Sequence, residues 1–223
     1  MSKGYDRRVL IKMEKELKTG TTTVGIKCRD GIVLGSDMRA TAGSMIAAKQ
    51  TRKIHKITDE MAVTWAGSVS DLQLMNKLLK AELKLKSLQT KRKITVKEAA
   101  NLLGGLLYSN VRQLTMIPAI THFILGGKDE EGFHLYDLYP DGSVEEMKDY
   151  SSSGSGSVFA FGVLEIEYKK DMSVQQGIDL AVKTVRTALE RDTGSGGGVL
   201  VFAITDKGVE ERIEKKIINQ LEE

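Results

Sequence analysis

The stretch GTTTVGIKCRDGIVLGSD, residues 20–37, predicts two β-strands with a turn between them. Residues 22–28 and 32–37 are rich in the β-branched and apolar residues that strands favour, and RDG at 29–31 is typical of a tight turn. We therefore expect a β-hairpin at the start of the fold. A leader, residues 1–20, precedes the first strand and ends in Gly20-Thr21.

Further elements follow the hairpin in blocks. After a turn at 41–44, strand composition recurs at 53–57, 61–67, 121–127, 133–139, 143–150, 198–204 and 209–213. Apolar residues at helical spacing predict helices at 70–86, 95–112, 157–168 and 173–190. Capping boxes mark the helix starts at Ser70, Thr95 and Ser173.

The order of these blocks favours an α+β fold over the strand–helix alternation of a doubly wound sheet. Antiparallel sheets with paired helices packed outside satisfy it. The chain shows no internal repeat and no long linker, so we expect residues 21–223 to form a single domain.

Composition excludes several classes of protein. The 223 residues are 41% hydrophobic and 28% charged, which are ordinary globular values. A net charge of +3 without a basic, aromatic-rich stretch argues against nucleic-acid binding. The single Cys28 excludes an internal disulfide and favours a reducing compartment. The leader does not resemble a signal peptide, and no membrane-spanning run is present, so we expect a soluble, cytoplasmic protein with no membrane partner.

Conventional catalytic motifs are missing from the sequence. The three histidines lack metal-ligand spacing, and the glycine runs at 154–156 and 194–198 lack the lysine of a phosphate loop. Neither Ser155 nor Ser195 has the flanking glycines of a nucleophile elbow. We therefore expect no metal and no organic cofactor.

The junction between Gly20 and Thr21 offers a different chemistry. If this peptide bond were cut, Thr21 would gain an α-amine with a pKa of about 7.7–8.0, able to accept the proton of its own hydroxyl. The attached leader would keep that nitrogen an amide and the protein inactive. The alternative is structural: a β-prone strand start preceded by a flexible glycine.

Five segments, in order along the chain, resemble the β-subunit of the proteasome core particle, of the archaeal type. The resemblance covers Thr21 to about Ile204. The segments are GTTTVGIKCRDGIVLGSDMRATAG, AAKQTRKIHKI, AGSVSDLQ, SSGSGSVFAFGVLE and RDTGSGGG. It implies the N-terminal-nucleophile hydrolase fold, a four-layer sandwich of two antiparallel β-sheets between helix layers.

The resemblance also implies a threonine endopeptidase that removes its own leader by cutting between Gly20 and Thr21. The backbone N–H of Gly67 corresponds to the family's oxyanion donor. Thr41 and Val69 correspond to positions whose main chain pairs with an extended substrate. The catalytic positions of the family are matched by Thr21 (the nucleophile), Asp37, Lys53, Ser155, Asp192 and Ser195.

Each match has a simpler explanation when it is taken singly. Asp37 could be a turn acid before Arg39, Lys53 part of a basic stretch, and Asp192 a helix end. Ser153 or Ser157 could take the place of Ser155.

One residue departs from the family pattern. Trp65 stands where smaller or unbranched side chains commonly shape the floor of the pocket for the residue before the scissile bond. A tryptophan there predicts a preference for small or slender apolar residues. In the alternative, Trp65 turns into the core and leaves the pocket open.

The resemblance implies an assembly as well. Two seven-membered β-rings would stack between two α-subunit rings, and an ATP-dependent regulatory particle would feed unfolded polypeptides to an enclosed chamber. Two other interpretations stay open. One is an unprocessed or weakly active structural β-subunit of a mixed ring. The other is a simpler bacterial proteasome-like peptidase, which the leader and C-terminal extension fit poorly.

Overall fold

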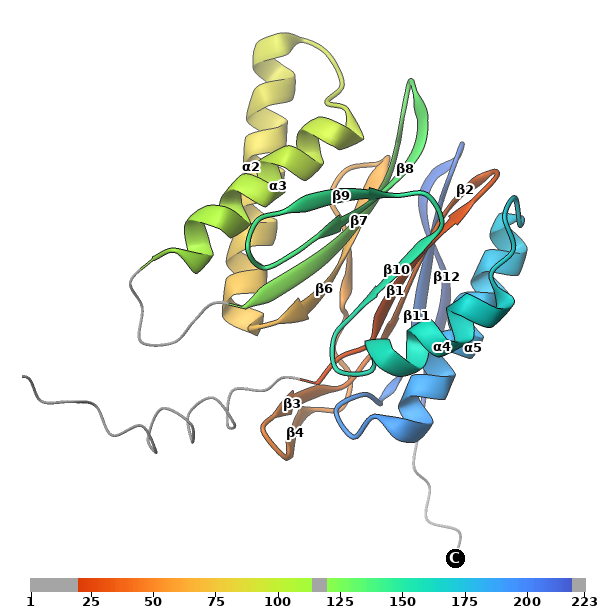
Figure 1. The fold of residues 1–223 in the computed structure, drawn as a ribbon. Helices are drawn as coiled ribbons and strands as arrows, with labels where there is room; N and C mark the ends of the chain where they lie inside the picture. Colours follow the sequence, from red (N-terminus) through yellow and green to blue (C-terminus); the bar gives the residue numbers. More distant parts are fainter. Residues whose placement is uncertain (1–19, 114–119, 218–223) are drawn as a thin grey trace, which may run out of the picture.

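The computed structural model describes residues 20–113 and 120–217. Two five-stranded antiparallel sheets lie face to face (Figure 1). The first has the order β10-β1-β2-β11-β12, and the second has the order β5-β6-β7-β8-β9. The strands of the first sheet are β1 (Thr23–Cys28), β2 (Gly31–Asp37), β10 (Tyr150–Ser153), β11 (Gly198–Thr205) and β12 (Gly208–Lys216). Those of the second are β5 (Ile54–Lys56), β6 (Met61–Gly67), β7 (Thr121–Asp129), β8 (Gly132–Leu138) and β9 (Val144–Met147).

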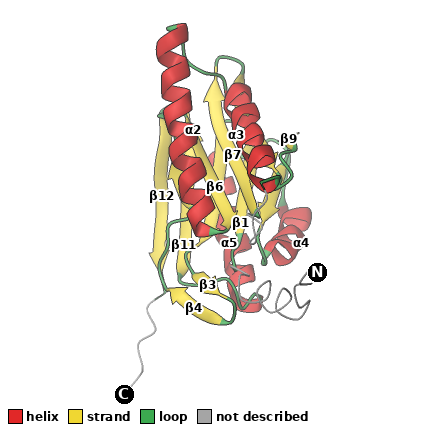
Figure 2. Cartoon of the chain, turned by 90° about the vertical axis from the view of Figure 1, so that its left-hand side faces the viewer, coloured by secondary structure: helices red, strands yellow, loops and turns green. Residues whose placement is uncertain are grey.

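Helices cover the outer face of each sheet. The pair α2 (Val69–Thr90) and α3 (Val96–Val111) packs on the second sheet, and the pair α4 (Ser157–Glu167) and α5 (Val174–Arg191) packs on the first (Figures 1 and 2). The expected α+β sandwich, with helices outside two antiparallel sheets, is confirmed.

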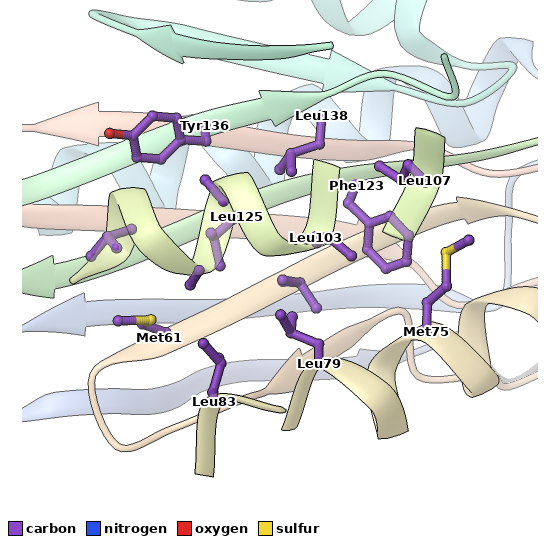
Figure 3. Packing of buried hydrophobic residues seen from close by; sticks show 14 of the residues in the cluster. Met61, Met75, Leu79, Leu83, Leu103, Leu107, Phe123, Leu125, Tyr136 and Leu138 are labelled. Atoms are coloured by element: carbon purple, nitrogen blue, oxygen red, sulfur yellow. The ribbon is translucent and has the colours of Figure 1, made fainter. Parts of the chain in front are cut away.

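The alternation of side chains along the strands produces these layers. In β2, Ile32 and Leu34 point into the core between the sheets, whereas Val33 packs with the residues of α5. On the far side, Phe123 and Leu125 of β7 pack against α2 and α3, as Figure 3 shows. Each sheet is therefore apolar on both faces, which explains the nearly continuous apolar runs of its central strands.

Two helix starts follow the predicted capping boxes, and the third does not. Thr95 and Ser173 each accept a hydrogen bond from the backbone N–H three residues on, and the side chains of Glu98 and Gln176 return the bond. The predicted start at Ser70 is wrong, because α2 begins at Val69 with Ser68 as an N-cap that makes no side-chain cap bond. Only Ser68 separates β6 from this helix, so the chain enters it too early for Ser70 to act as a cap.

The expected single strand at 143–150 is also wrong, because this segment contributes to both sheets. β9 pairs with β8 in the second sheet, and β10 pairs with β1 in the first. The chain crosses between the sheets at Lys148 and Asp149.

A short hairpin surrounds the predicted turn at 41–44. Its strands are β3 (Ala40–Ala42) and β4 (Met45–Ala48). None of the helices within residues 20–113 and 120–217 is long and apolar enough to span a membrane.

Candidate active site

Thr21 lies just before β1, and its neighbour Gly20 bonds to Thr41 of β3. The β3–β4 hairpin is attached at one end of the sandwich (Figure 1). The chain runs unbroken from Gly20 into Thr21, and both residues are buried. The Thr21 hydroxyl donates a hydrogen bond of 2.6 Å to the carbonyl oxygen of Gly20. The hydroxyl is therefore held beside the peptide bond that precedes it.

Lys53 brings a cation to this hydroxyl. It lies directly before β5 and is 3% exposed. Its Nζ lies 3.0 Å from Thr21 Oγ1 and 3.3 Å from the Gly20 carbonyl oxygen. Burial lowers the pKa of Lys53 below its ordinary value, and the neighbouring Asp37 carboxylate partly opposes this effect. The ammonium is thus placed to share a proton with the hydroxyl or to stabilise negative charge on the carbonyl oxygen.

Asp37, at the end of β2, fixes the position of this lysine. Its Oδ1 accepts from Lys53 Nζ at 2.7 Å and from the backbone N–H of Thr22 at 2.9 Å. Its Oδ2 accepts from the backbone N–H groups of Arg39 and Gly196, each at 3.0 Å. Asp37 is fully buried, and four donors compensate its charge. It is therefore an internal anchor rather than a surface turn acid.

A second polar network approaches the nitrogen of Thr21. The Thr21 N–H lies 3.2 Å from Ser155 Oγ, and the Ser155 hydroxyl donates to Asp192 Oδ2 at 2.6 Å. Ser195 donates to the same carboxylate oxygen, also at 2.6 Å. Ser153 bonds instead to Thr23, so Ser155 is the serine that this network contains. The five other predicted catalytic residues thus lie around Thr21, directly or through this network.

Two of the three predicted substrate-binding residues, Trp65 and Val69, border a small cavity beside Thr21, and the third, Thr41, is not part of its lining. This cavity, of about 20 Å³, is lined by Gly20, Thr21, Ala40, Thr51, Lys53, Trp65, Gly67, Val69 and Leu72. Gly67 has a φ of +128°, and a methyl group there would lie 2.2 Å from the Ile120 carbonyl oxygen. Only glycine fits this position, and Gly67 lines the same cavity as Thr21.

The sequence left open whether Trp65 shapes the pocket or turns into the core, and its side chain contacts both. It is 7% exposed and belongs to the core beneath α2 and α3, with its ring centroid 3.8 Å from that of His55. It also lines the cavity. The side chain is therefore held firmly while it limits the space beside Thr21.

Sequence reasoning missed two hydroxyl groups at the site. Thr22 Oγ1 lies 2.7 Å from Ser195 Oγ, and Thr41 Oγ1 accepts from the Gly20 N–H. The run of three threonines at 21–23 was the available signal for a role of Thr22 at the site. The β-propensity of threonine already explained that run. Within the described ranges, His, Cys, Asp and Glu side chains form no group of three or more that could hold a metal ion.

Comparison with known proteins gives a consistent result. A family model described as "Proteasome subunit" matches residues 17–204. A "Proteasome subunit beta" from Methanocaldococcus vulcanius is 43% identical over 203 residues, which cover 91% of this chain and 89% of the relative. Its namesake from Methanocaldococcus jannaschii is 44% identical over 205 residues, or 90% of each chain. That from Nanoarchaeum equitans is 44% identical over 190 residues, covering 85% of this chain and 95% of the relative.

Proposed function

Because the chain belongs to the proteasome subunit family, as a β-subunit of the core particle, we propose that it is a threonine protease with Thr21 as the nucleophile. The observation that carries this proposal is the position of the Lys53 ammonium, within hydrogen-bonding distance of the Thr21 hydroxyl, the Asp37 carboxylate and the Gly20 carbonyl.

The first step is self-cleavage of an inactive precursor. Thr21 Oγ1 attacks the carbonyl carbon of Gly20 while Lys53 stabilises the charge on the carbonyl oxygen. The C–N bond to Thr21 then breaks and its nitrogen takes up the proton that the hydroxyl has lost, which leaves Gly20 as an ester on Oγ1. Water hydrolyses this ester and releases residues 1–20, so that residues 21–223 form the active subunit.

The same hydroxyl then cuts substrate. The new α-amine of Thr21, with a reference pKa of about 7.7–8.0, takes the hydroxyl proton as Oγ1 attacks a peptide carbonyl. The peptide C–N bond breaks as the proton passes to the departing amine, and water then hydrolyses the ester on Oγ1. Asp37 holds Lys53 in place, and the group Ser155, Asp192 and Ser195 orients the amine. The Gly67 N–H donates to the developing oxyanion, and the main chains of Thr41 and Val69 pair with the extended substrate.

A proteasome β-subunit works within an assembly of α- and β-subunits. We extend the proposal to seven-membered β-rings stacked between α-rings in the cytoplasm. An ATP-dependent regulatory particle would act through the α-ring and deliver unfolded polypeptides. The support for this arrangement is the family membership of the chain.

N-terminal sequencing and intact mass of assembled particles test the proposed processing. The subunit is expected to begin at Thr21 and to have lost the mass of residues 1–20. Active particles in which every subunit keeps the leader would contradict the proposal. Inactive particles with the leader attached would favour the structural β-subunit instead.

The small cavity beside Trp65 predicts the cleavage preference. Peptides with alanine or another small or slender apolar residue before the scissile bond should be cut faster than those with Phe or Tyr. Replacing Trp65 by alanine should shift this preference toward Phe by about tenfold, because it removes most of the side chain that limits the space. Fluorogenic peptides varied at that position measure both effects.

Turnover of the alanine peptide by the Trp65→Ala particles controls for a general loss of activity. If the unaltered protein cleaves equally well or better after Phe or Tyr, Trp65 does not set the size of the pocket.

A further inference from the structure

The peptide unit before Thr21 is held by a side chain that the proposed chemistry does not use. The backbone N–H of Gly20 donates a buried hydrogen bond of 2.6 Å to the hydroxyl of Thr41, a β3 residue that is 6% exposed. The role inferred from the family for Thr41 involves only its main chain. The hydroxyl therefore needs a separate explanation.

Gly20 also packs closely against the loop that carries Ser195. A methyl group on Gly20 would lie 2.1 Å from the Cα atom of Gly194, and a methyl group on Gly194 would lie 2.5 Å from the Cα atom of Gly20. Both separations are far below a van der Waals contact. The two backbones can meet this closely only because neither residue has a side chain.

Together these contacts fix Gly20 on three sides. Its N–H is bound by Thr41, its Cα rests on Gly194, and its carbonyl oxygen is contacted by Thr21 Oγ1 and Lys53 Nζ. A rotation of the Gly20 backbone would carry its carbonyl away from the Thr21 hydroxyl. Such a loss of alignment slows a reaction even when the reacting groups are unchanged.

We propose that the Thr41 hydroxyl and the bare backbone of Gly194 position the Gly20 carbonyl for self-cleavage. This inference rests on the proposed self-cleavage at Gly20–Thr21. Both contacts involve Gly20, so they exist only while the leader is attached. We therefore expect them to act on the removal of the leader, whereas the later hydrolysis of peptides involves Thr41 through its main chain.

The test compares Thr41→Val with Thr41→Ser in the full chain. Valine keeps the shape of threonine but accepts no hydrogen bond, whereas serine keeps the hydroxyl. Loss of the leader is followed over time by intact mass, and peptide hydrolysis is expressed per cut subunit. Thr41→Val should slow leader removal by about tenfold, the effect of one lost buried hydrogen bond on a rate. Thr41→Ser should stay within about twofold of the unaltered rate.

Gly194→Ala tests the second contact and should slow leader removal by about tenfold or more, because its methyl group would lie 2.5 Å from the Gly20 Cα atom and 3.0 Å from Ser155 Oγ. Gly105→Ala is the matched control, since a methyl group at Gly105 of α3 meets no atom within 4 Å. It should leave the rate of leader removal unchanged.

The inference is overturned if Thr41→Val loses its leader at the unaltered rate, or if Thr41→Ser is slowed as much as Thr41→Val. Failure of the proposed function gives a different result, namely active unaltered particles that keep the leader.

Discussion

Replacing Thr21 by alanine should leave the leader attached and lower peptide hydrolysis by at least about 10⁴-fold, as the loss of a catalytic nucleophile does in other proteases. The substitution removes the Oγ1 atom that lies beside the Gly20 carbonyl and 3.0 Å from Lys53 Nζ. Both reactions should stop together, because the proposal assigns them to the same atom. Intact mass and turnover of a fluorogenic peptide, measured on the same particles, check the two effects.

Two further variants separate chemistry from packing. Thr21→Ser keeps the hydroxyl but loses the branched Cβ that restricts χ1, so it should remain active at a reduced rate. Thr23→Ala removes a buried hydroxyl from the same run of threonines, one that bonds to Ser153 rather than to Lys53. It should lower hydrolysis by no more than about tenfold. Peptide turnover that survives in Thr21→Ala particles would rule out Thr21 as the nucleophile.

Replacing Lys53 by alanine should lower both leader removal and peptide hydrolysis by about 10³-fold, the effect of losing a charge that stabilises a transition state in a buried site. Its ammonium contacts the Thr21 hydroxyl and the Gly20 carbonyl, and burial holds its pKa below the ordinary value for lysine. Kinetics of leader loss and of peptide turnover measure the two effects.

The fold should survive this change better than an isolated buried ion pair would. Without Lys53, Asp37 still accepts three backbone N–H bonds, from Thr22, Arg39 and Gly196. Lys56→Ala is the matched control, because this lysine of β5 is half-exposed and bonds only to Asp59 among the described ion pairs. Assembled Lys53→Ala particles with full activity would disprove the role proposed for Lys53.

The sequence predicted those parts of the fold that depend on neighbouring residues. The hairpin of β1 and β2 and the helix starts at Thr95 and Ser173 are each encoded within a few positions, so composition and capping pattern were sufficient. The division of 143–150 between two sheets depends on partners far along the chain. Alternation of side chains indicates a strand but does not identify its sheet.

The site shows the same contrast. Gly20-Thr21 was noticeable because the chemistry proposed for it involves two adjacent residues. Lys53, by contrast, was assigned through the family resemblance alone, and the structure adds the atoms that it contacts. The Thr41 hydroxyl could not be found from the sequence, since it meets a backbone N–H 21 positions away. A side chain whose hydrogen-bond partner is the backbone of a distant residue leaves no pattern in the sequence around it.

The hydrogen-bonded pairing of β1 with β10 limits where residues can be inserted into this chain. Thr23 is opposite Ser153, so the two strands, continued by two residues each, bring Thr21 and Ser155 together. A shift of one residue in this ladder would move Ser155 along the strand by about 3.4 Å, more than a hydrogen bond can absorb. Length can therefore vary only before Asp149, because the carbonyl oxygen of Asp149 accepts a hydrogen bond of 2.7 Å from the Lys27 N–H and so continues the ladder. The spacing from Asp149 to Ser155 is fixed as strictly as the spacing from Thr21 to β1.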